Sequence, residues 1–147
     1  MEFGLAMAPG VSFIGHAPLD DVEDLYRSVR HSEMVQDNGL WRPTSQAFGD
    51  RRLRTSVDIA FLAGNDPSRS RKAPVNGQSQ WVVGLKVGQA RSAGSAFEMI
   101  DGVDVVPAPL DGNPAHAEIV LTPEHEKAHR RLRGYLAKVS MVVLAAE

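Results

Sequence analysis

Polar side chains suited to proton transfer recur on one face of two predicted strands. Ser56 and Asp58 lie opposite apolar side chains in one alternating segment, and His116 and Glu118 do so in another. A carboxylate beside an imidazole shifts the pKa of both groups, as happens in catalytic and binding sites. The simpler interpretation, which the pattern favours, is a sheet face that meets water.

A lysine extends this polar face in the most regular predicted strand, which covers residues 81–89. Lys86 alternates with apolar residues and stands between Gly84 and Gly88. Because glycine carries no side chain, a ligand or another part of the backbone can approach closely there. Lys86 and Asp58 are therefore candidate ligand-binding residues.

Arg27 is a candidate whose role depends on the structure of residues 20–31. Apolar residues recur at helical spacing there, which predicts a helix at least over 20–25, and a strand is the alternative. In a strand, Arg27 would lie on an otherwise apolar face and need a partner, which Asp58 or Glu118 could supply. In a helix, Arg27 would be a surface residue.

Residues 125–129 read His-Glu-Lys-Ala-His, the spacing of a zinc-protease helix. There His125 and His129 would chelate the metal and Glu126 would polarise water. Charged residues surround the motif and no further histidine follows it, unlike the buried helix of such enzymes. We therefore expect no metal ion and no other cofactor, with a looser site that joins His116 and Glu118 to His125 as the alternative.

Three basic clusters, at 51–54, 69–72 and 130–133, could contact an anion. The guanidinium group suits phosphate because its donors form a planar fork. Acidic residues lie near each cluster, no aromatic residues are interleaved for base stacking, and the formal net charge is −2. Nucleic acid is therefore an alternative partner that the sequence does not favour.

These residues must be positioned by secondary-structure elements, and the predicted elements together indicate an α+β domain. The alternating segments form a mostly antiparallel sheet, and a C-terminal helix over about 123–137 packs on one face of it. That helix begins with an N-cap threonine and a first-turn proline. The apolar tail at 139–144 fits a final strand or a continued helix. Residues 37–39 and 111–114 are predicted turns, and 63–79 is the longest predicted loop.

Composition fits one globular domain. The chain has 147 residues, of which 43% are hydrophobic and 23% charged, and it contains no cysteine. No apolar stretch approaches the roughly 18 residues of a membrane span, and the N-terminus lacks the basic start of a signal peptide. We therefore expect a flexible arm over 1–18, a single domain over 19–147, no membrane partner and a cytoplasmic location.

Four blocks of sequence stand together in one order: L-Y-R at 25–27, R-P-T-S-Q-A-F at 42–48, S-V-D at 56–58 and N-P-A-H-A at 113–117. Together they resemble a family of short, uncharacterised bacterial proteins. The resemblance implies a stand-alone domain without naming a reaction. It points to five residues as candidates: Arg27, Arg42, Ser45, Ser56 and His116. Arg42 and Ser45 are accordingly added to the candidate ligand-binding residues.

Arg27, Ser56 and Glu118 also follow the order of key residues in ADP-ribosyltransferase-like folds, which the chain resembles more faintly. That resemblance implies an Arg that holds a pyrophosphate, a Ser that supports a nicotinamide pocket and a Glu that stabilises an oxocarbenium-like ribose. The chain departs from the pattern at His116, where Gln or Glu often precedes the catalytic Glu.

The residues contain no convincing catalytic motif. The expected function is therefore that of a small, soluble bacterial binding module that acts with a protein partner or a small ligand. The alternative is an enzyme, a nucleotide- or nucleic-acid-directed transferase with His116 as general acid or base. An enzyme should have a concave pocket where Arg27, Ser56 and Glu118 converge, whereas a binding module should have a flat apolar or edge-strand patch.

Overall fold

Six antiparallel strands form the main sheet of this computed structural model, which describes residues 18–49, 54–93, 102–121 and 128–147. In spatial order they are β6 (Asp104–Pro107), β7 (His116–Val120), β4 (Arg54–Ile59), β1 (Asp24–Val29), β5 (Trp81–Lys86) and β8 (Met141–Leu144). A separate hairpin pairs β2 (Met34–Asp37) with β3 (Leu40–Pro43). Among the described residues, four 3-10 helices lie in the connections, at His31–Glu33, Ser45–Phe48, Ala60–Ala63 and Pro67–Arg69.

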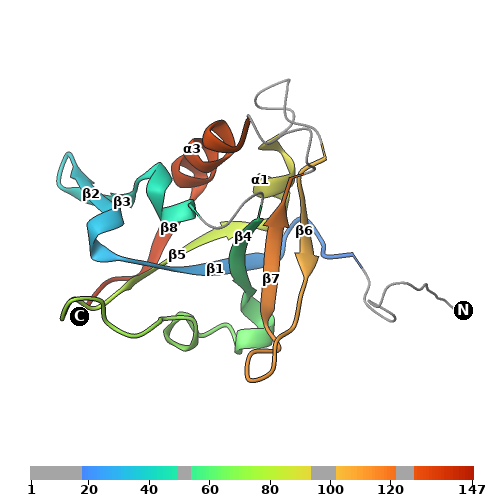
Figure 1. The fold of residues 1–147 in the computed structure, drawn as a ribbon, viewed down its shortest axis with the longest axis horizontal. Coiled ribbons are helices and arrows are strands. Elements are labelled where there is room, and N and C mark those ends of the chain that lie inside the picture. The colour runs from blue at the N-terminus through green and yellow to red at the C-terminus, as the bar shows by residue number, and fades with distance from the viewer. Residues whose placement is uncertain (1–17, 50–53, 94–101, 122–127) are drawn as a thin grey trace, which may run out of the picture.

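The main core lies on one face of the sheet, against helix α3 (His129–Val139). Side chains alternate between the two faces of each strand, so Leu25 and Ile59 point into this core, where both are buried. Leu132 of α3 belongs to the same buried cluster and is 1% exposed. Figure 1 shows α3 on one side of the sheet and the segment 60–79, in green, on the other. The second face is therefore the one that carries the polar residues.

The predicted fold class, an antiparallel sheet with a C-terminal helix on one face, is confirmed. The predicted start of that helix at 123 lies outside the described residues, as does the N-terminal arm up to residue 17. In the apolar tail at 139–144, for which strand and helix were both open, Val139 ends α3 and residues 141–144 form strand β8. No helix among the described residues is both long enough and apolar enough to span a lipid bilayer.

The helix predicted over 20–25 is wrong, because the chain turns at 21–22 and then forms strand β1. Leu25 and Val29 face the main core, while Tyr26 on the opposite face packs in a second apolar cluster with Val82. A strand that buries apolar side chains on both faces loses its period of two. The resulting spacing resembles that of a helix.

The strand predicted over 81–89 is also shorter than expected. It ends at Lys86, and helix α1 (Val87–Arg91) follows directly. Gly88 belongs to that helix, and a Cβ there would lie 2.9 Å from Cβ of Asp21. The glycine therefore allows the chain before β1 to pack closely against α1.

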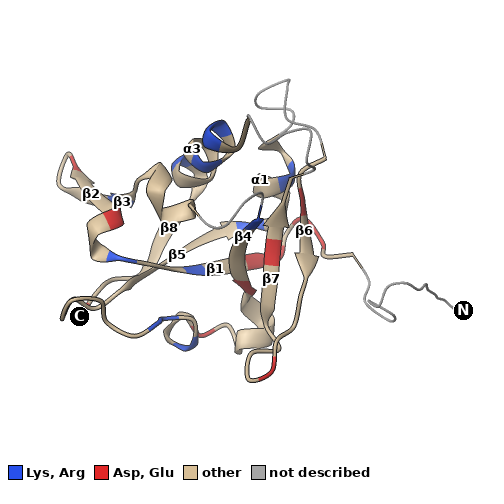
Figure 2. Ribbon diagram, in the orientation of Figure 1, with Lys and Arg blue, Asp and Glu red and all other residues tan. Residues whose placement is uncertain are grey.

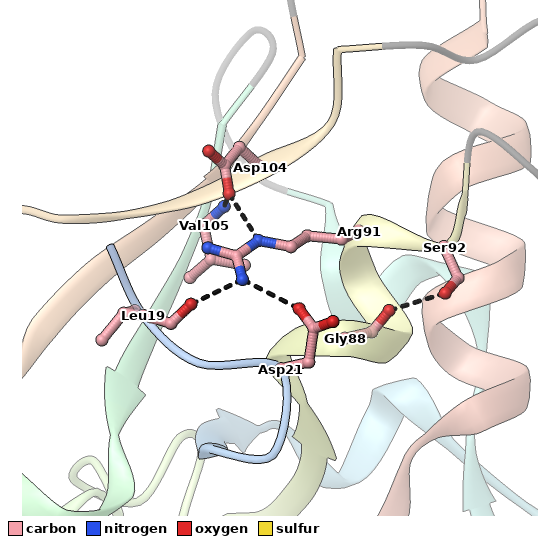
Figure 3. Close-up of polar contacts among 7 residues, drawn as sticks. All are labelled: Leu19, Asp21, Gly88, Arg91, Ser92, Asp104 and Val105. Atoms are coloured by element: carbon pink, nitrogen blue, oxygen red, sulfur yellow. Dashed lines mark hydrogen bonds and ion pairs between the residues drawn. The ribbon is translucent and has the colours of Figure 1, made fainter. Parts of the chain in front are cut away.

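Arg91, at the end of α1, holds three separate segments together (Figure 3). Its Nε donates to Asp104 at the start of β6 over 2.8 Å, and its Nη1 donates to Asp21 over 2.9 Å. Nη1 also donates to the carbonyl of Leu19. These carboxylates raise the pKa of the Arg91 guanidinium above its usual value. Arg91 thus fixes the entry into β1 against one edge of the sheet.

Candidate functional site

A cavity of about 510 Å³ opens on the face of the sheet opposite α3. Its floor consists of side chains from three adjacent strands, namely Tyr26 and Ser28 of β1, Ser56 and Asp58 of β4, and His116 of β7. Its walls come from two connections, with residues 69–72 on one side and Leu110, Gly112 and Asn113 on the other. Ligand pockets in proteins commonly have volumes of roughly 300–1,000 Å³, so the cavity is large enough for a small molecule.

The cavity opens where β1 and β4 pair only briefly. Their pairing is limited to Leu25 with Ile59 and Tyr26 with Asp58. Beyond that point, the carbonyl of Ser56 accepts a hydrogen bond from the Arg27 guanidinium, 2.6 Å from Nη1. The Arg27 side chain therefore links β1 to β4 where the backbone pairing between the two strands ends.

Arg27 itself reaches the core face rather than the cavity. Its Nε donates to the carbonyl of Ala47 over 2.6 Å, and its guanidinium lies 5.8 Å from the centre of the Phe48 ring. Since successive side chains of a strand point to opposite faces, Arg27 contributes backbone to the cavity lining. Its position on an apolar face, between Leu25 and Val29, is the one expected for a strand.

The basic wall at 69–72 is anchored to the floor by Ser28. The Ser28 hydroxyl accepts a hydrogen bond from the backbone N–H of Lys72 over 2.9 Å and donates to Gln80 Oε1 over 2.8 Å. In Figure 2 this basic segment, coloured blue, lies on the side of the sheet opposite α3. The predicted loop over 63–79 therefore brings one of the three basic clusters to the polar face.

The opposite wall is held by the turn that precedes β7. Asn113 Nδ2 donates to Asp58 Oδ1 over 3.0 Å. His116 Nδ1 lies 2.9 Å from the carbonyl of Ala108, which can only accept, so Nδ1 carries the proton of this bond. In the neutral imidazole, Nε2 is then an acceptor. Asp58 and His116, which are paired across β4 and β7, thus offer acceptor atoms side by side.

Two polar atoms in the basic wall have no hydrogen-bond partner. Ser70 is 6% exposed, and its hydroxyl is buried without a partner; Arg71 Nε is in the same state. Both residues line the cavity. Buried polar atoms are normally satisfied, so these two atoms are exceptions, but both are covered by neighbouring atoms and are not open to the cavity.

The structure brings together the side chains of three candidate site residues, Ser56, Asp58 and His116, and Arg27 lines the same cavity through its backbone. Glu118 is paired with Arg54 and does not line the cavity. Arg27, Ser56 and Glu118 therefore do not converge on one ligand position, which departs from the arrangement expected for an enzyme. A concave cavity is present all the same, where a binding module was expected to have a flat patch.

The remaining candidate ligand-binding residues lie elsewhere. Lys86 is paired with Asp24 over 2.8 Å, on the same sheet face but outside the cavity. Gly84 beside it does not form an open floor, because a Cβ there would meet Val143 of β8 at 3.0 Å. Arg42 pairs with Asp37 in the β2–β3 hairpin. Ser45 begins the 3-10 helix on the core side.

The sequence did not single out several cavity residues, among them Tyr26, Ser28, Ser70 and Asn113. Asn113 belongs to the N-P-A-H-A block, which was the available signal for it. Ser28 and Ser70 gave no signal, since their roles depend on contacts between segments far apart in the chain.

The zinc-protease motif lies mostly outside the described residues, because only its last two positions, Ala128 and His129, are placed. In the described parts of the chain, no three His, Asp or Glu side chains are grouped as metal ligands would be. Comparison with protein-family models, with curated proteins and with solved structures finds no match for this chain. The cavity therefore has to be interpreted from its own chemistry.

Proposed function

We propose that this domain binds a small polar molecule in the cavity above β1, β4 and β7. The observation that carries the proposal is a cavity of about 510 Å³ whose floor gathers hydroxyl, carboxylate and imidazole groups from three strands. Such a concave set of convergent polar groups is typical of small-molecule sites.

The placement of Arg27 and Glu118 supports binding over the transferase alternative. A transferase of the kind considered above needs Arg27, Ser56 and Glu118 around one ligand. The Arg27 guanidinium is engaged on the core face, and Glu118 is paired with Arg54. The cavity can hold a ligand without either side chain.

A thermal-shift screen tests the proposal, with a panel of nucleotides, sugar phosphates, free sugars and amino acids. A ligand at a hundred times its dissociation constant should stabilise the fold by about 2.7 kcal/mol. For a chain of this length that free energy raises Tm by about 8 °C. Ser56→Leu, which places a larger side chain on the cavity floor, should remove the shift. Urea unfolding of the variant checks that it remains folded.

Arg42→Met is the matched control, because Arg42 is exposed in the β2–β3 hairpin and does not line the cavity. It should keep the full shift. The proposal fails if no compound of the panel stabilises the wild type. It also fails if the shift is the same in folded Ser56→Leu as in the wild type.

A further inference from the structure

We infer that the ligand is a phosphorylated compound that also carries hydroxyl groups, with the phosphate at the 69–72 wall and the hydroxyls at Asp58 and His116. This inference rests on the proposed function, and it specifies the ligand class of the same cavity. A sugar phosphate and a nucleotide share this chemistry.

Cations outnumber carboxylates in the cavity lining. Arg69, Arg71 and Lys72 carry positive charges, whereas Asp58 carries the one negative charge among the lining residues. Lys72 is exposed and has no ion-pair partner among the described residues, and Arg69 only approaches the exposed Asp66 at 4.0 Å. These two side chains can turn to an anion without losing a strong contact. A phosphate accepts charge-assisted hydrogen bonds from both.

Arg71 is held differently from its neighbours. Its Nη1 is paired with Glu147 over 3.2 Å and its Nη2 donates to the carbonyl of Ala145, while its side chain is 15% exposed. The guanidinium is thereby fixed at the wall, with Nε left as an unpartnered donor. The hydroxyl of Ser70 next to it is the second unpartnered group. Both atoms are covered by neighbouring atoms, so Arg71 contributes its positive charge to the wall, while Arg69 and Lys72 supply the donors for the phosphate.

The other side of the cavity offers the opposite chemistry. Asp58 Oδ1 accepts a hydrogen bond from Asn113, so Oδ2 is available as an acceptor for a ligand. In the neutral ring, His116 Nε2 is a second acceptor. Two adjacent acceptors match two donors on a ligand, such as the hydroxyl groups of a sugar or the N–H groups of an amine. The negative charge of Asp58 also disfavours a phosphate on this side, which fixes the direction of the ligand.

The dimensions agree with such a ligand. His116 lies on β7 and Ser28 on β1, two strand spacings apart and two residues out of register, which corresponds to about 12 Å between their Cα atoms. Ser28 marks the phosphate side, because its hydroxyl holds the backbone of Lys72. Because the side chains on both sides shorten this gap, one extended pentose phosphate can reach from the 69–72 wall to Asp58 and His116.

The test is calorimetric titration of the protein with ribose 5-phosphate, adenosine monophosphate, ribose and inorganic phosphate. At least one phosphorylated sugar should bind about tenfold or more tightly than ribose and than inorganic phosphate. Tighter binding of adenosine monophosphate identifies a nucleotide as the ligand, whereas equal binding of both phosphates identifies the sugar phosphate part as sufficient. Affinity should fall as the salt concentration rises.

Variants separate the two sides of the cavity. The double variant Arg69→Gln, Lys72→Gln should bind the phosphorylated compound about tenfold or more weakly and show a smaller salt dependence. Asp58→Asn should weaken binding of the phosphorylated sugar but not that of inorganic phosphate. The control is Arg130→Gln, Lys138→Gln on α3, which removes the same charges from exposed positions on the other side of the sheet. It should bind as the wild type does.

Three results would overturn the inference. Ribose could bind as tightly as its phosphate, the α3 double variant could lose as much affinity as the cavity double variant, or unphosphorylated compounds of the earlier panel could bind while phosphates do not. In the first and third cases the proposed function still stands, since a small polar molecule is bound. If nothing in either panel binds, the proposed function has failed together with the inference.

Discussion

Replacing Arg27 by methionine should destabilise the fold more than any other arginine substitution in the sheet. The Arg27 guanidinium donates to the carbonyls of Ala47 and Ser56, both over 2.6 Å, and to that of Gly49 over 3.5 Å. It thereby joins β1 to β4 and to the segment that carries Phe48. Methionine retains most of the apolar stem but has no donor.

The size of the effect follows from the two short bonds. A hydrogen bond from a charged donor contributes about 1.5–3 kcal/mol, and a buried carbonyl that loses its donor adds to the cost. Apolar contacts of the methionine with Phe48 offset part of this loss. We expect the free energy of unfolding to fall by about 3 kcal/mol, which lowers Tm by about 10 °C for a chain of this length.

Urea unfolding followed by circular dichroism measures the change. Arg27→Lys keeps the charge but lacks the fork that reaches two carbonyls, so its loss should be intermediate, about 2 kcal/mol. Arg42→Met is the control, since its ion pair with Asp37 is exposed and contributes less than about 0.5 kcal/mol. A loss below about 1 kcal/mol in Arg27→Met would refute the reasoning, because the hydrogen bonds to Ala47 and Ser56 would then contribute little to the free energy of unfolding.

Three further substitutions test the packing of Leu132, the ion pairs of Arg91 and the buried phenol of Tyr26. Leu132→Ala should cost about 3 kcal/mol in urea unfolding, against less than about 0.5 kcal/mol for Leu110→Ala at an exposed position; similar losses would contradict the core described above. Arg91→Met should cost about 1 kcal/mol, and high salt should shrink that difference, since its carboxylate partners are exposed; a loss independent of salt would point to packing instead. Burial raises the pKa of Tyr26 above its usual 10.0, and nearby carboxylates add to the shift. The stabilisation that it provides is therefore complete below pH 10.0 and is lost as the pH rises through the folded-state pKa. Tyr26→Phe should reduce this loss of stability at alkaline pH in urea unfolding. An unchanged pH profile would contradict the assigned role of Tyr26.

Much of the fold could be predicted because several segments keep a clear period. The alternation from Trp81 to Lys86 identified the strand that pairs with β1, and the turn at Asn38 and Gly39 was evident from residue types. Both residues have positive φ, 52° and 81°, which asparagine and glycine tolerate better than other residues. Local chemistry alone determines such features, so local sequence suffices to predict them.

Other features depend on contacts that the sequence does not display. Tyr26 is buried because it packs with Ala60 and Val82 on its face of the sheet, and this burial obscured the strand pattern. The partners of Arg27 are backbone carbonyls at 47 and 56, whereas the sequence suggested carboxylates of Asp58 or Glu118. A guanidinium accepts any oxygen of suitable geometry, so residue types alone could not select its partner.

The same limit applies to the candidate site. Ser56, Asp58 and His116 were predicted to share a polar face because alternation is local, and the structure places all three in the cavity lining. Lys86 also shares that face, but two strands further across the sheet, where Asp24 pairs with it. The register and order of strands decide which polar residues meet, and neither follows from the period of a single strand.

The short pairing between β1 and β4 divides the sheet into two halves, β6-β7-β4 and β1-β5-β8, joined by two residue pairs along a narrow seam. A molecule in the cavity would contact both halves and add interactions between them where the backbone provides few hydrogen bonds. Ligand binding and the integrity of the seam are then thermodynamically linked, so occupancy should slow amide hydrogen exchange in β1 and β4 more than in the outer strands.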